Sequence, residues 1–521
     1  MNLSKKIPEA VHKVGKLITD QGGTWFLVGG ACVDALLANT PKDWDIEVHG
    51  LSFPEVAYAL STLSPHPVGK SFGIFKLDHR LVDGLEIDVS IPRRENTIGK
   101  GHKDFEVSFH PNMTPKDAAE RRDFTINSMF YNPLTETILD PFGGLKDLQN
   151  GVLRMTSKEK FIEDPLRGLR AMQLLARKAK TVDPETMKVI REMSDQFSTI
   201  AKERVFEEFS KLLLKADKPS IGLNFLLESN WLRHFPELYQ FAFWDGWKEK
   251  ENAVFKDTAP EFMTSGCPQN PEWHPEGDVW IHNNMVVDAA AKVRHMVEED
   301  LQLTFMFGAL LHDLGKVVTT LLPQCTAHAH DCKGKELTET FMARITTEKK
   351  LTKQVIALVV NHLQPFMLTS GEAKSSAWKR LHKKVFYRLD ILGWLSRSDW
   401  AGRPNRNPLV PCENGIEMDH PASALCWKWQ RTLGQKPIEP IIMGRDLIAV
   451  GIEPGRCMGI ILKHTFETQI DNPHLTKSEL LEIALYLKNN HVPPPAACVS
   501  PEVPSQGNSM NANNLIKTLG K

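Results

Sequence analysis

Two acidic residues near the N-terminus are spaced to share one face of a strand. Asp43 and Asp45 stand at i and i+2 in DWDIEVHG, a stretch with strand-like composition. Two like charges this close are unfavourable unless a cation neutralises them, and Mg²⁺ takes oxygen ligands. Asp88, in the strand-like stretch LEIDVSIP, can complete a two-metal site. Two solvated turn acids and an unrelated strand acid explain this pattern equally well.

A glycine pair lies upstream of these acids, between a strand-like stretch, TWFLV, and a helix-like one, ACVDALLA. Because glycine has no Cβ, the backbone at Gly29 and Gly30 can approach a phosphate closely at the start of a helix. A tight turn is the commoner reason for such a pair. Together with the acids, the pair predicts a phosphate-binding turn.

Basic and amide side chains follow in RRDFTIN. Arg121, Arg122 and Asp123 place two guanidinium groups where each can donate to two phosphate oxygens at once. Asn127, about one helical turn later, is predicted to orient a sugar or a phosphate. The alternative is a cluster of ion pairs at the surface.

A third group lies in EDPLRGLRAMQLLAR, where Asp164 and Arg167 are spaced i and i+3. On a helix they would share one face, as an acceptor beside a donor. Cytosine and adenine present the matching amino donor and ring-nitrogen acceptor, whereas uracil and guanine do not. Arg170, one turn further, is predicted to contact the phosphates or to switch the base pocket. An ordinary intrahelical ion pair is the alternative.

A second, separate set of chemical groups occupies the middle of the chain. His312 and Asp313 are adjacent in GALLHDLGK, His282 lies upstream and Asp399 downstream. Two imidazoles and two carboxylates offer ligands for a divalent transition metal or Mg²⁺, which would present hydroxide to a phosphate ester. Further histidines are predicted to support these ligands rather than to bind, namely His274, His330 and His362.

The elements that position these groups predict a multidomain α+β protein. Alternating strand and helix patterns indicate an α/β head over 1–155, and helical spacing indicates an all-α neck and body over 156–260. A second all-α domain is expected over 274–403 and a helical C-terminal unit over 404–492. The composition of 493–521 is typical of a disordered tail.

Composition limits the possible classes. The 521 residues are 41% hydrophobic and 24% charged, as in ordinary globular proteins, with a formal net charge of −1. Nucleic-acid contacts must therefore come from local basic patches. No signal peptide or membrane span is expected, and eight scattered cysteines fit a reducing compartment. These features predict a cytoplasmic protein.

The N-terminal motifs resemble, in order, those of the class II tRNA nucleotidyltransferases and bacterial poly(A) polymerases. The resemblance rests on the following segments: VGGACVDALLANTPKDWDIEV, RRDFTINSMFYNP, LDPFGGLKDL, EDPLRGLRAMQLLAR and AKERVFEEFSKLL. It implies a polymerase-beta-like nucleotidyltransferase head with Mg²⁺ on Asp43 and Asp45, and Asp88 as a further ligand or a proton acceptor. By the same resemblance, CTP and ATP are joined to tRNA 3′ ends without a nucleic-acid template.

Two details of the resemblance bear on the site. Val33 stands where this family has an arginine that contacts the nucleotide, which predicts weaker binding of the triphosphate. Glu203, Arg204 and Glu208 resemble the neck motif of the family and are predicted to form ion pairs that fix the helix carrying Asp164.

The middle of the chain resembles the HD phosphohydrolase domain appended to tRNA nucleotidyltransferases of Gram-negative type. The similarity runs from QNPEWHPEGDVWIHN to LLHDLGK and follows the order H…HD…D. It implies a 2′,3′-cyclic phosphodiesterase, 2′-nucleotidase or phosphatase.

Two other functions fit the same sequence. A poly(A) polymerase or partial-CCA adder shares the head motifs. An RNA-binding HD hydrolase with an inactive transferase head would account for Val33. The sequence predicts neither the oligomeric state nor the substrate and metal of the HD domain.

Overall fold

The structure is a computed structural model that describes residues 7–37, 39–68, 73–97, 105–246, 266–371, 373–404 and 420–490. The chain divides into two compact units. The first comprises residues 1–352 and 401–409, and the second comprises 353–400 and 410–521. Two of the three boundaries fall within or at the end of helices, α16 (Lys349–Asn361) and α19 (Leu389–Ala401).

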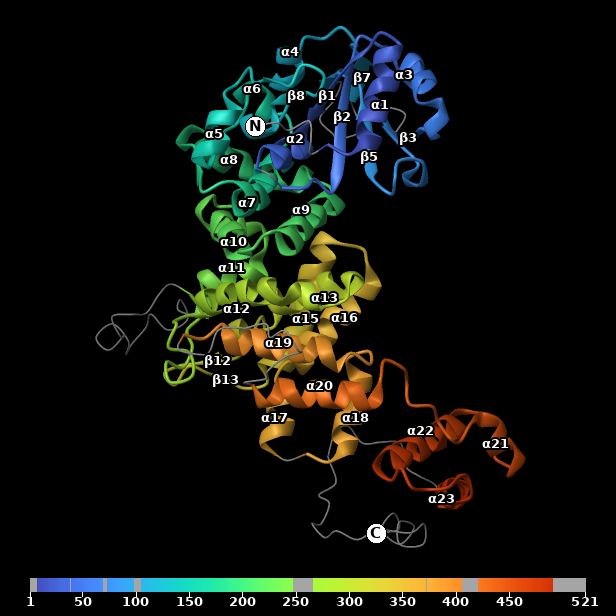
Figure 1. Cartoon of the computed structure of the whole chain (residues 1–521). Coiled ribbons are helices and arrows are strands. Elements are labelled where there is room, and N and C mark those ends of the chain that lie inside the picture. Colours follow the sequence, from blue (N-terminus) through green and yellow to red (C-terminus); the bar gives the residue numbers. More distant parts are fainter. Residues whose placement is uncertain are drawn as a thin grey trace. The chain divides into compact units, whose positions relative to one another are not determined.

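The head is built on a seven-stranded mixed sheet in the order β3-β4-β5-β2-β1-β8-β9 (Figure 1). Only β2 and β5 run parallel, and every other neighbouring pair in this sheet is antiparallel. Its strands are β1 (Thr24–Val28), β2 (Asp43–His49), β3 (His66–Val68), β4 (Ile74–Lys76), β5 (Glu86–Ser90), β8 (Phe130–Asn132) and β9 (Thr137–Leu139). A separate hairpin pairs β6 (Arg93–Thr97) with β7 (Phe105–Phe109).

Short helices cover the sheet because its central strands are apolar. Along β1 the residues from Trp25 to Val28 are all buried, and α1 packs against this strand. The helix α2 lies against β1, β2 and β8, beside the strand that carries Asp43 and Asp45. The helices of the head are α1 (Glu9–Asp20), α2 (Gly29–Leu36), α3 (Phe53–Ala59), α4 (Pro115–Glu120) and α5 (Gly144–Asn150).

Beyond the head, the described part of the first unit is mostly helical. In the neck, α7 (Leu166–Lys178) packs against α9 (Lys202–Lys215) and α10 (Pro219–Glu228). Each has an apolar stripe at helical spacing; on α7 it includes the fully buried Leu169 and Met172. The other helices of this part are α6 (Lys158–Phe161), α8 (Pro184–Met193), α11 (Pro236–Ala242), α12 (Val279–Val293), α13 (Glu299–Leu311), α14 (Lys316–Thr319) and α15 (His330–Ile345).

Two short parallel strands, β10 (Val152–Leu153) and β11 (Thr181–Val182), and a short hairpin, β12 (Thr320–Leu321) with β13 (Thr326–Ala327), interrupt this helical region. The second unit is helical among the residues described. Besides most of α16 and α19, its helices are α17 (Gln364–Ser370), α18 (Ser375–Lys384), α20 (Pro421–Leu433), α21 (Gly444–Ala449), α22 (Arg456–Asp471) and α23 (Lys477–Asn489). The last three of these helices share an apolar core that includes Leu447, Ile461 and Ile483.

The predicted fold class is confirmed, since an α/β head precedes a predominantly helical remainder. The hairpin β12–β13 was not predicted, because each of its strands is too short to show a period. The tail predicted over 493–521 lies outside the described residues. Within the described ranges, no helix has the length and apolar character that crossing a bilayer requires.

Candidate functional site

The three predicted acids of the head lie together at the junction of β2 and β5. The parallel register pairs Asp45 with Asp88 and Asp43 with Glu86. Because residues two apart on a strand share a face, Asp43 and Asp45 point to the same side, as the sequence predicted. Lys76 of β4, which the sequence analysis did not single out, makes an ion pair of 3.5 Å with Asp88.

Burial raises the proton affinity of Asp45 and Asp88. Burial, followed by the charge of Asp88, raises the pKa of Asp45 to about 6. Burial also raises the pKa of Asp88. A cluster of acids that resist ionisation suits a divalent cation, because the cation favours the charged form of each carboxylate. The donor set therefore fits Mg²⁺.

The glycine pair begins α2 beside these acids. Gly29 has a φ of +58°, and a Cβ there would lie 3.3 Å from a carboxylate oxygen of Asp45 and 3.8 Å from a guanidinium nitrogen of Arg122. Both the left-handed backbone and the close approach favour glycine. At Gly30 a Cβ would meet nothing within 4 Å. The first turn of α2 thus faces both an acid and a cation of the predicted site.

A third acid of β2, Glu47, organises the basic residues. It is 1% exposed, and its Oε2 accepts a hydrogen bond of 2.8 Å from Arg122 and a longer one of 3.5 Å from Arg121. His49 lies 3.1 Å from its Oε1. Burial alone would raise the pKa of Glu47, but Arg122 and the hydrogen bond with His49 lower it to about 2. Glu47 is two residues beyond Asp45, a spacing that sequence analysis could have used.

Asp123, which is buried, and Asn127 join this network. Asn127 donates a hydrogen bond of 3.0 Å to Asp123, and Arg170 of α7 forms an ion pair of 3.2 Å with the other oxygen of Asp123. Arg122 also donates to the backbone carbonyl of Asn127 at 3.1 Å. These contacts link the head to α7, and the nucleotide contacts of these residues stay a prediction.

The sequence predicts that Asp164 and Arg167 share one helix face, and the structure shows that they do not. The helix α7 begins at Leu166, so Asp164 precedes it, and its carboxylate accepts from the Leu166 amide at 3.1 Å. Arg204 of α9 donates to both oxygens of Asp164, at 3.2 and 2.7 Å, which confirms the predicted neck ion pair for Arg204, whereas Glu208 pairs with Lys211 of its own helix. The predicted pairing of Asp164 with Arg167 is wrong, because Arg167 instead donates to the carbonyls of Lys160 and Arg121, each at 2.7 Å.

The position that departs from the family pattern is buried. Val33 on α2 is 1% exposed. Its neighbour Asp34 forms an ion pair with Lys178 at the end of α7. The valine therefore packs in the interior of the head, and the adjacent acid makes another link between the head and the neck.

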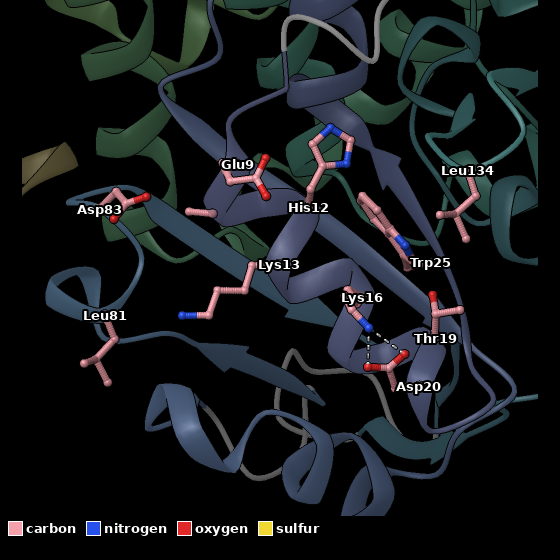
Figure 2. A pocket seen from close by; sticks show the side chains of 11 residues that line it. Glu9, His12, Lys13, Lys16, Thr19, Asp20, Trp25, Leu81, Asp83 and Leu134 are labelled. Carbon is pink, nitrogen blue, oxygen red and sulfur yellow. Dashed lines mark hydrogen bonds and ion pairs between the residues drawn. The ribbon is translucent and has the colours of Figure 1, made fainter.

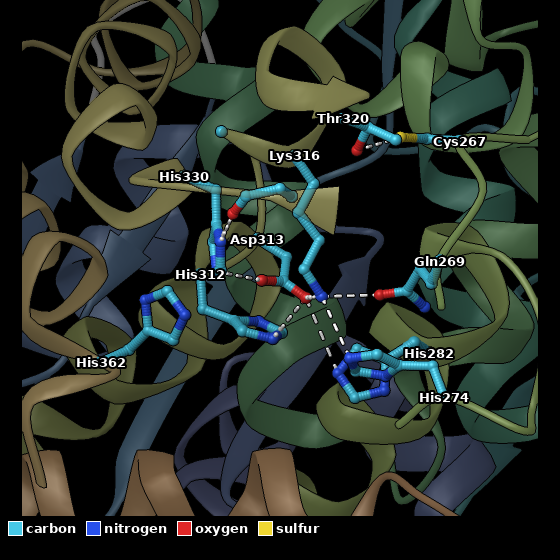
Figure 3. Close-up of polar contacts among 12 residues, drawn as sticks. Cys267, Gln269, His274, His282, His312, Asp313, Lys316, Thr320, His330 and His362 are labelled. Carbon is cyan, nitrogen blue, oxygen red and sulfur yellow. Dashed lines mark hydrogen bonds and ion pairs between the residues drawn. The ribbon is translucent and has the colours of Figure 1, made fainter. Parts of the chain in front are cut away.

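Four residues of the second set converge in the first unit, together with Lys316, which the sequence did not indicate (Figure 3). Nε2 of His312 and of His282 lie 3.2 and 3.7 Å from Oδ2 of Asp313, and Nε2 of His330 lies 3.3 Å from Oδ1. Lys316 makes an ion pair of 2.7 Å with Oδ2. Burial opposes ionisation of Asp313, but His312 and Lys316 hold its pKa well below the ordinary value.

The opposite ring nitrogens of these histidines face acceptors. Nδ1 of His312 lies 2.9 Å from the carbonyl of Ala309, and Nδ1 of His330 lies 2.8 Å from the carbonyl of Ala327. A carbonyl can only accept, so Nδ1 carries a proton and Nε2 is the nitrogen that each histidine turns toward Asp313, where it can bind a metal once deprotonated. This is the usual arrangement of metal-binding histidines, and the set fits a divalent metal.

Additional groups surround this cluster. Lys316 donates to Gln269 at 2.6 Å and lies 3.4 Å from Nε2 of His274. Burial and the charge of Lys316 lower the pKa of His274 to about 4. Gln269 was missed because a single glutamine carries no sequence signal of metal chemistry. The fourth predicted ligand, Asp399, and His362 belong to the second unit, so a ligand role for either stays a prediction.

An open pocket of about 450 Å³ lies elsewhere on the head (Figure 2). It is lined mainly by α1, with Trp25 of β1 and Leu134, and contains the ion pair between Lys16 and Asp20. None of the residues predicted to do chemistry lines it.

Comparison with known proteins supplies further observations. Residues 25–154 match the poly A polymerase head domain, and 181–241 match the probable RNA and SrmB-binding site of polymerase A. The multifunctional CCA protein of Xylella fastidiosa (strain 9a5c) is 31% identical over 387 residues, which is 73% of this chain and 80% of that protein. The multifunctional CCA protein of Vibrio parahaemolyticus is 30% identical over 409 residues, covering 75% and 89%.

Solved structures share the fold. The CCA-adding enzyme of Bacillus stearothermophilus in complex with CTP aligns with a TM-score of 0.60 at 17% identity, over 93% of this chain and 100% of that one. The Thermotoga maritima CCA-adding enzyme complexed with tRNA aligns with a TM-score of 0.51 at 18% identity, over 93% and 97%.

The raised pKa of Asp45 makes a prediction about stability. Its folded pKa lies above the unfolded value, so the free energy of unfolding falls as pH rises from about 4 to about 6. Asp45→Asn should therefore stabilise the protein at pH 7.5 in EDTA, by on the order of 1 kcal/mol. Urea titration measures this difference, and added Mg²⁺ should stabilise the wild type more than the variant. A variant less stable than the wild type in EDTA would contradict the carboxylate cluster.

Proposed function

The chain belongs to the family of the multifunctional CCA proteins, and we propose that it adds C and A from CTP and ATP to tRNA 3′ ends without a nucleic-acid template. The observation that carries the proposal is the carboxylate cluster of Asp43, Asp45 and Asp88 beside the first turn of α2. A turn that accepts phosphate next to acids that accept a cation fits a nucleoside triphosphate. The relatives named multifunctional CCA proteins support the addition of C and A, and the Thermotoga maritima CCA-adding enzyme complexed with tRNA supports tRNA as the acceptor.

The chain's own residues have separable tasks in this reaction. Asp43 and Asp45 would hold Mg²⁺, which when bound stabilises negative charge on the triphosphate and lowers the pKa of a coordinated hydroxyl. Asp88, opposite Asp45 and paired with Lys76, would join them or accept the proton of the RNA 3′-hydroxyl. Arg122, held by Glu47 at the first turn of α2, supplies a fixed cation for the phosphates.

Base selection is proposed for the interface between head and neck. Arg204 donates to both oxygens of Asp164, which holds the carboxylate in one orientation. Each carboxylate oxygen accepts more than one hydrogen bond, so Asp164 can also accept from the amino group of cytosine or adenine. Arg167 anchors the loop before α7 to the backbone at Lys160 and Arg121, and reaching a ring nitrogen would require it to leave these carbonyls.

Incubating tRNA that lacks the terminal CCA with each labelled nucleotide tests the transferase. The wild type should add C and then A, and neither U nor G. Asp43→Ala should lose at least nine-tenths of incorporation, because a lost metal contact costs several kcal/mol. Asp164→Ala should reduce the preference for CTP and ATP by about one to two orders of magnitude.

Glu185→Ala, a change in an exposed ion pair with Lys158, is the matched control. Long runs of A without C would instead identify a poly(A) polymerase. Near-normal addition by Asp43→Ala would overturn the proposed metal ligands.

A second activity is proposed for the cluster around Asp313. The convergence of Nε2 atoms from His282, His312 and His330 on one carboxylate favours a metal-dependent phosphohydrolase. A divalent transition metal or Mg²⁺ held there would supply a hydroxide at neutral pH. Lys316, beside the same carboxylate, is placed to donate to a phosphate oxygen of the substrate. A 2′,3′-cyclic phosphate, a 2′-phosphate or a phosphate monoester is the proposed substrate class.

The two activities should be separable, because their residues come from different elements. His312→Ala combined with Asp313→Ala should abolish hydrolysis of 2′,3′-cyclic AMP in the presence of Ni²⁺, Co²⁺, Mn²⁺ or Mg²⁺. Incorporation of CTP and ATP by this variant should stay within about twofold of the wild type, since the head carboxylates are untouched. Hydrolysis by the wild type and by the variant is measured by chromatographic separation of 2′,3′-cyclic AMP from its ring-opened product, 2′-AMP or 3′-AMP. Equal rates would overturn the assignment of this cluster.

A further inference from the structure

One carboxylate, Glu276, contacts two histidines of the second cluster. It lies in the loop before α12, and its side chain is 2% exposed. Its Oε1 is 2.8 Å from Nδ1 of His274 and 2.7 Å from Nδ1 of His282. The two imidazole rings lie edge to face, with centroids 4.6 Å apart. A single buried oxygen therefore holds both rings.

The distances distinguish a hydrogen bond from shared metal ligation. Two ligand atoms about 2.1 Å from one tetrahedral ion lie about 3.4 Å apart. The contacts of Glu276, at 2.7 and 2.8 Å, are shorter than this separation: the one with His274 is a hydrogen bond, and the one with His282 is an ion-pair contact at hydrogen-bond distance. The nitrogen-to-oxygen distances around Asp313, from 3.2 to 3.7 Å, are those expected of ligands to a common ion. Glu276 is thus a hydrogen-bond acceptor, and Asp313 is placed as a ligand.

The hydrogen bonds decide which ring nitrogen is available. A histidine that donates Nδ1–H to Glu276 keeps its lone pair on Nε2. Nε2 of His282 lies 3.7 Å from Asp313, and Nε2 of His274 lies 3.4 Å from Lys316, whose ammonium contacts the same carboxylate. Nε2 of both histidines therefore faces the space beside Oδ2 of Asp313. In the structure the ammonium group of Lys316 occupies this space.

We propose that Glu276 is a positioning residue of this metal site and that His274 is one of the ligands. The proposal rests on the proposed phosphohydrolase function and extends the ligand set beyond His282, His312 and Asp313. Glu276 acts on two ligands at once, whereas the carbonyls of Ala309 and Ala327 each orient one histidine. Loss of its charge should therefore weaken metal binding more than loss of either carbonyl contact.

Calorimetric titration with Ni²⁺ tests the proposal without an activity assay. The parent chain for this titration is the full-length protein with Asp43→Ala and Asp45→Asn, so that Ni²⁺ binding at the head does not contribute to the heat measured. Glu276→Gln should raise the Kd for Ni²⁺ by about 10- to 100-fold. His274→Ala should also raise it by at least tenfold, and combining the two changes should cost less than the sum of both.

Controls separate positioning from folding. Glu272→Gln, in an exposed residue of the same loop, should leave the Kd unchanged. Thermal melting of the metal-free variants reports any structural loss, and Glu276→Asp keeps the charge if Glu276→Gln fails to fold. The aspartate is one methylene shorter, so it should give a Kd between those of the wild type and the glutamine variant.

The outcomes are distinguishable. If the parent chain binds no Ni²⁺, both the proposed phosphohydrolase site and this inference fail. If it binds Ni²⁺, and a folded Glu276→Gln or Glu276→Asp variant binds it equally well, the positioning role is overturned and the metal site stands. Normal affinity of His274→Ala, with weak binding by Glu276→Gln, would overturn the ligand role of His274 alone.

Discussion

The ion pair between Glu47 and Arg122 is the interaction on which the head site depends. Burying a lone carboxylate is costly, and Glu47 is tolerated in the sheet because Arg122 and His49 contact it. The same pair fixes a guanidinium beside Asp45 and the first turn of α2. Removing Arg122 leaves the buried carboxylate of Glu47 with only His49 and the longer contact to Arg121, so the folding and the chemistry of the head share one constraint.

Polar contacts extend this constraint into the neck. Arg170 binds Asp123, Arg204 binds Asp164, and Lys178 binds Asp34. Each pair joins a residue of the head, or of the loop after it, to α7 or α9. Such pairs hold long side chains in one orientation, which a site that selects bases by hydrogen bonding requires. The second cluster uses a similar arrangement, in which acceptors outside the site orient each histidine toward Asp313.

Sequence periodicity explains which parts of the site were predictable. Asp43 and Asp45 follow the two-residue repeat of a strand, and Asp88 lies in the next long strand, so their common face could be inferred. The pairing of Asp164 could not be inferred from spacing alone, because α7 begins after it and long arginine side chains choose partners from other elements. Glu276 was missed because its two histidines are two and six residues away in sequence, with a loop between. The composition predicts a loop over 251–273 and a linker over 402–415, and most of each lies outside the described part of the chain.

The most direct test of this account is the rate of single-turnover CTP addition to tRNA lacking CCA by Glu47→Gln. This variant keeps the shape of the side chain but removes the charge that holds Arg122. The account predicts a rate at least tenfold lower, together with a loss of stability of about 3 kcal/mol that accompanies a broken buried pair. The rate is measured at a temperature where the variant is fully folded. An unchanged rate in the folded variant would contradict the claim that Glu47 organises the site.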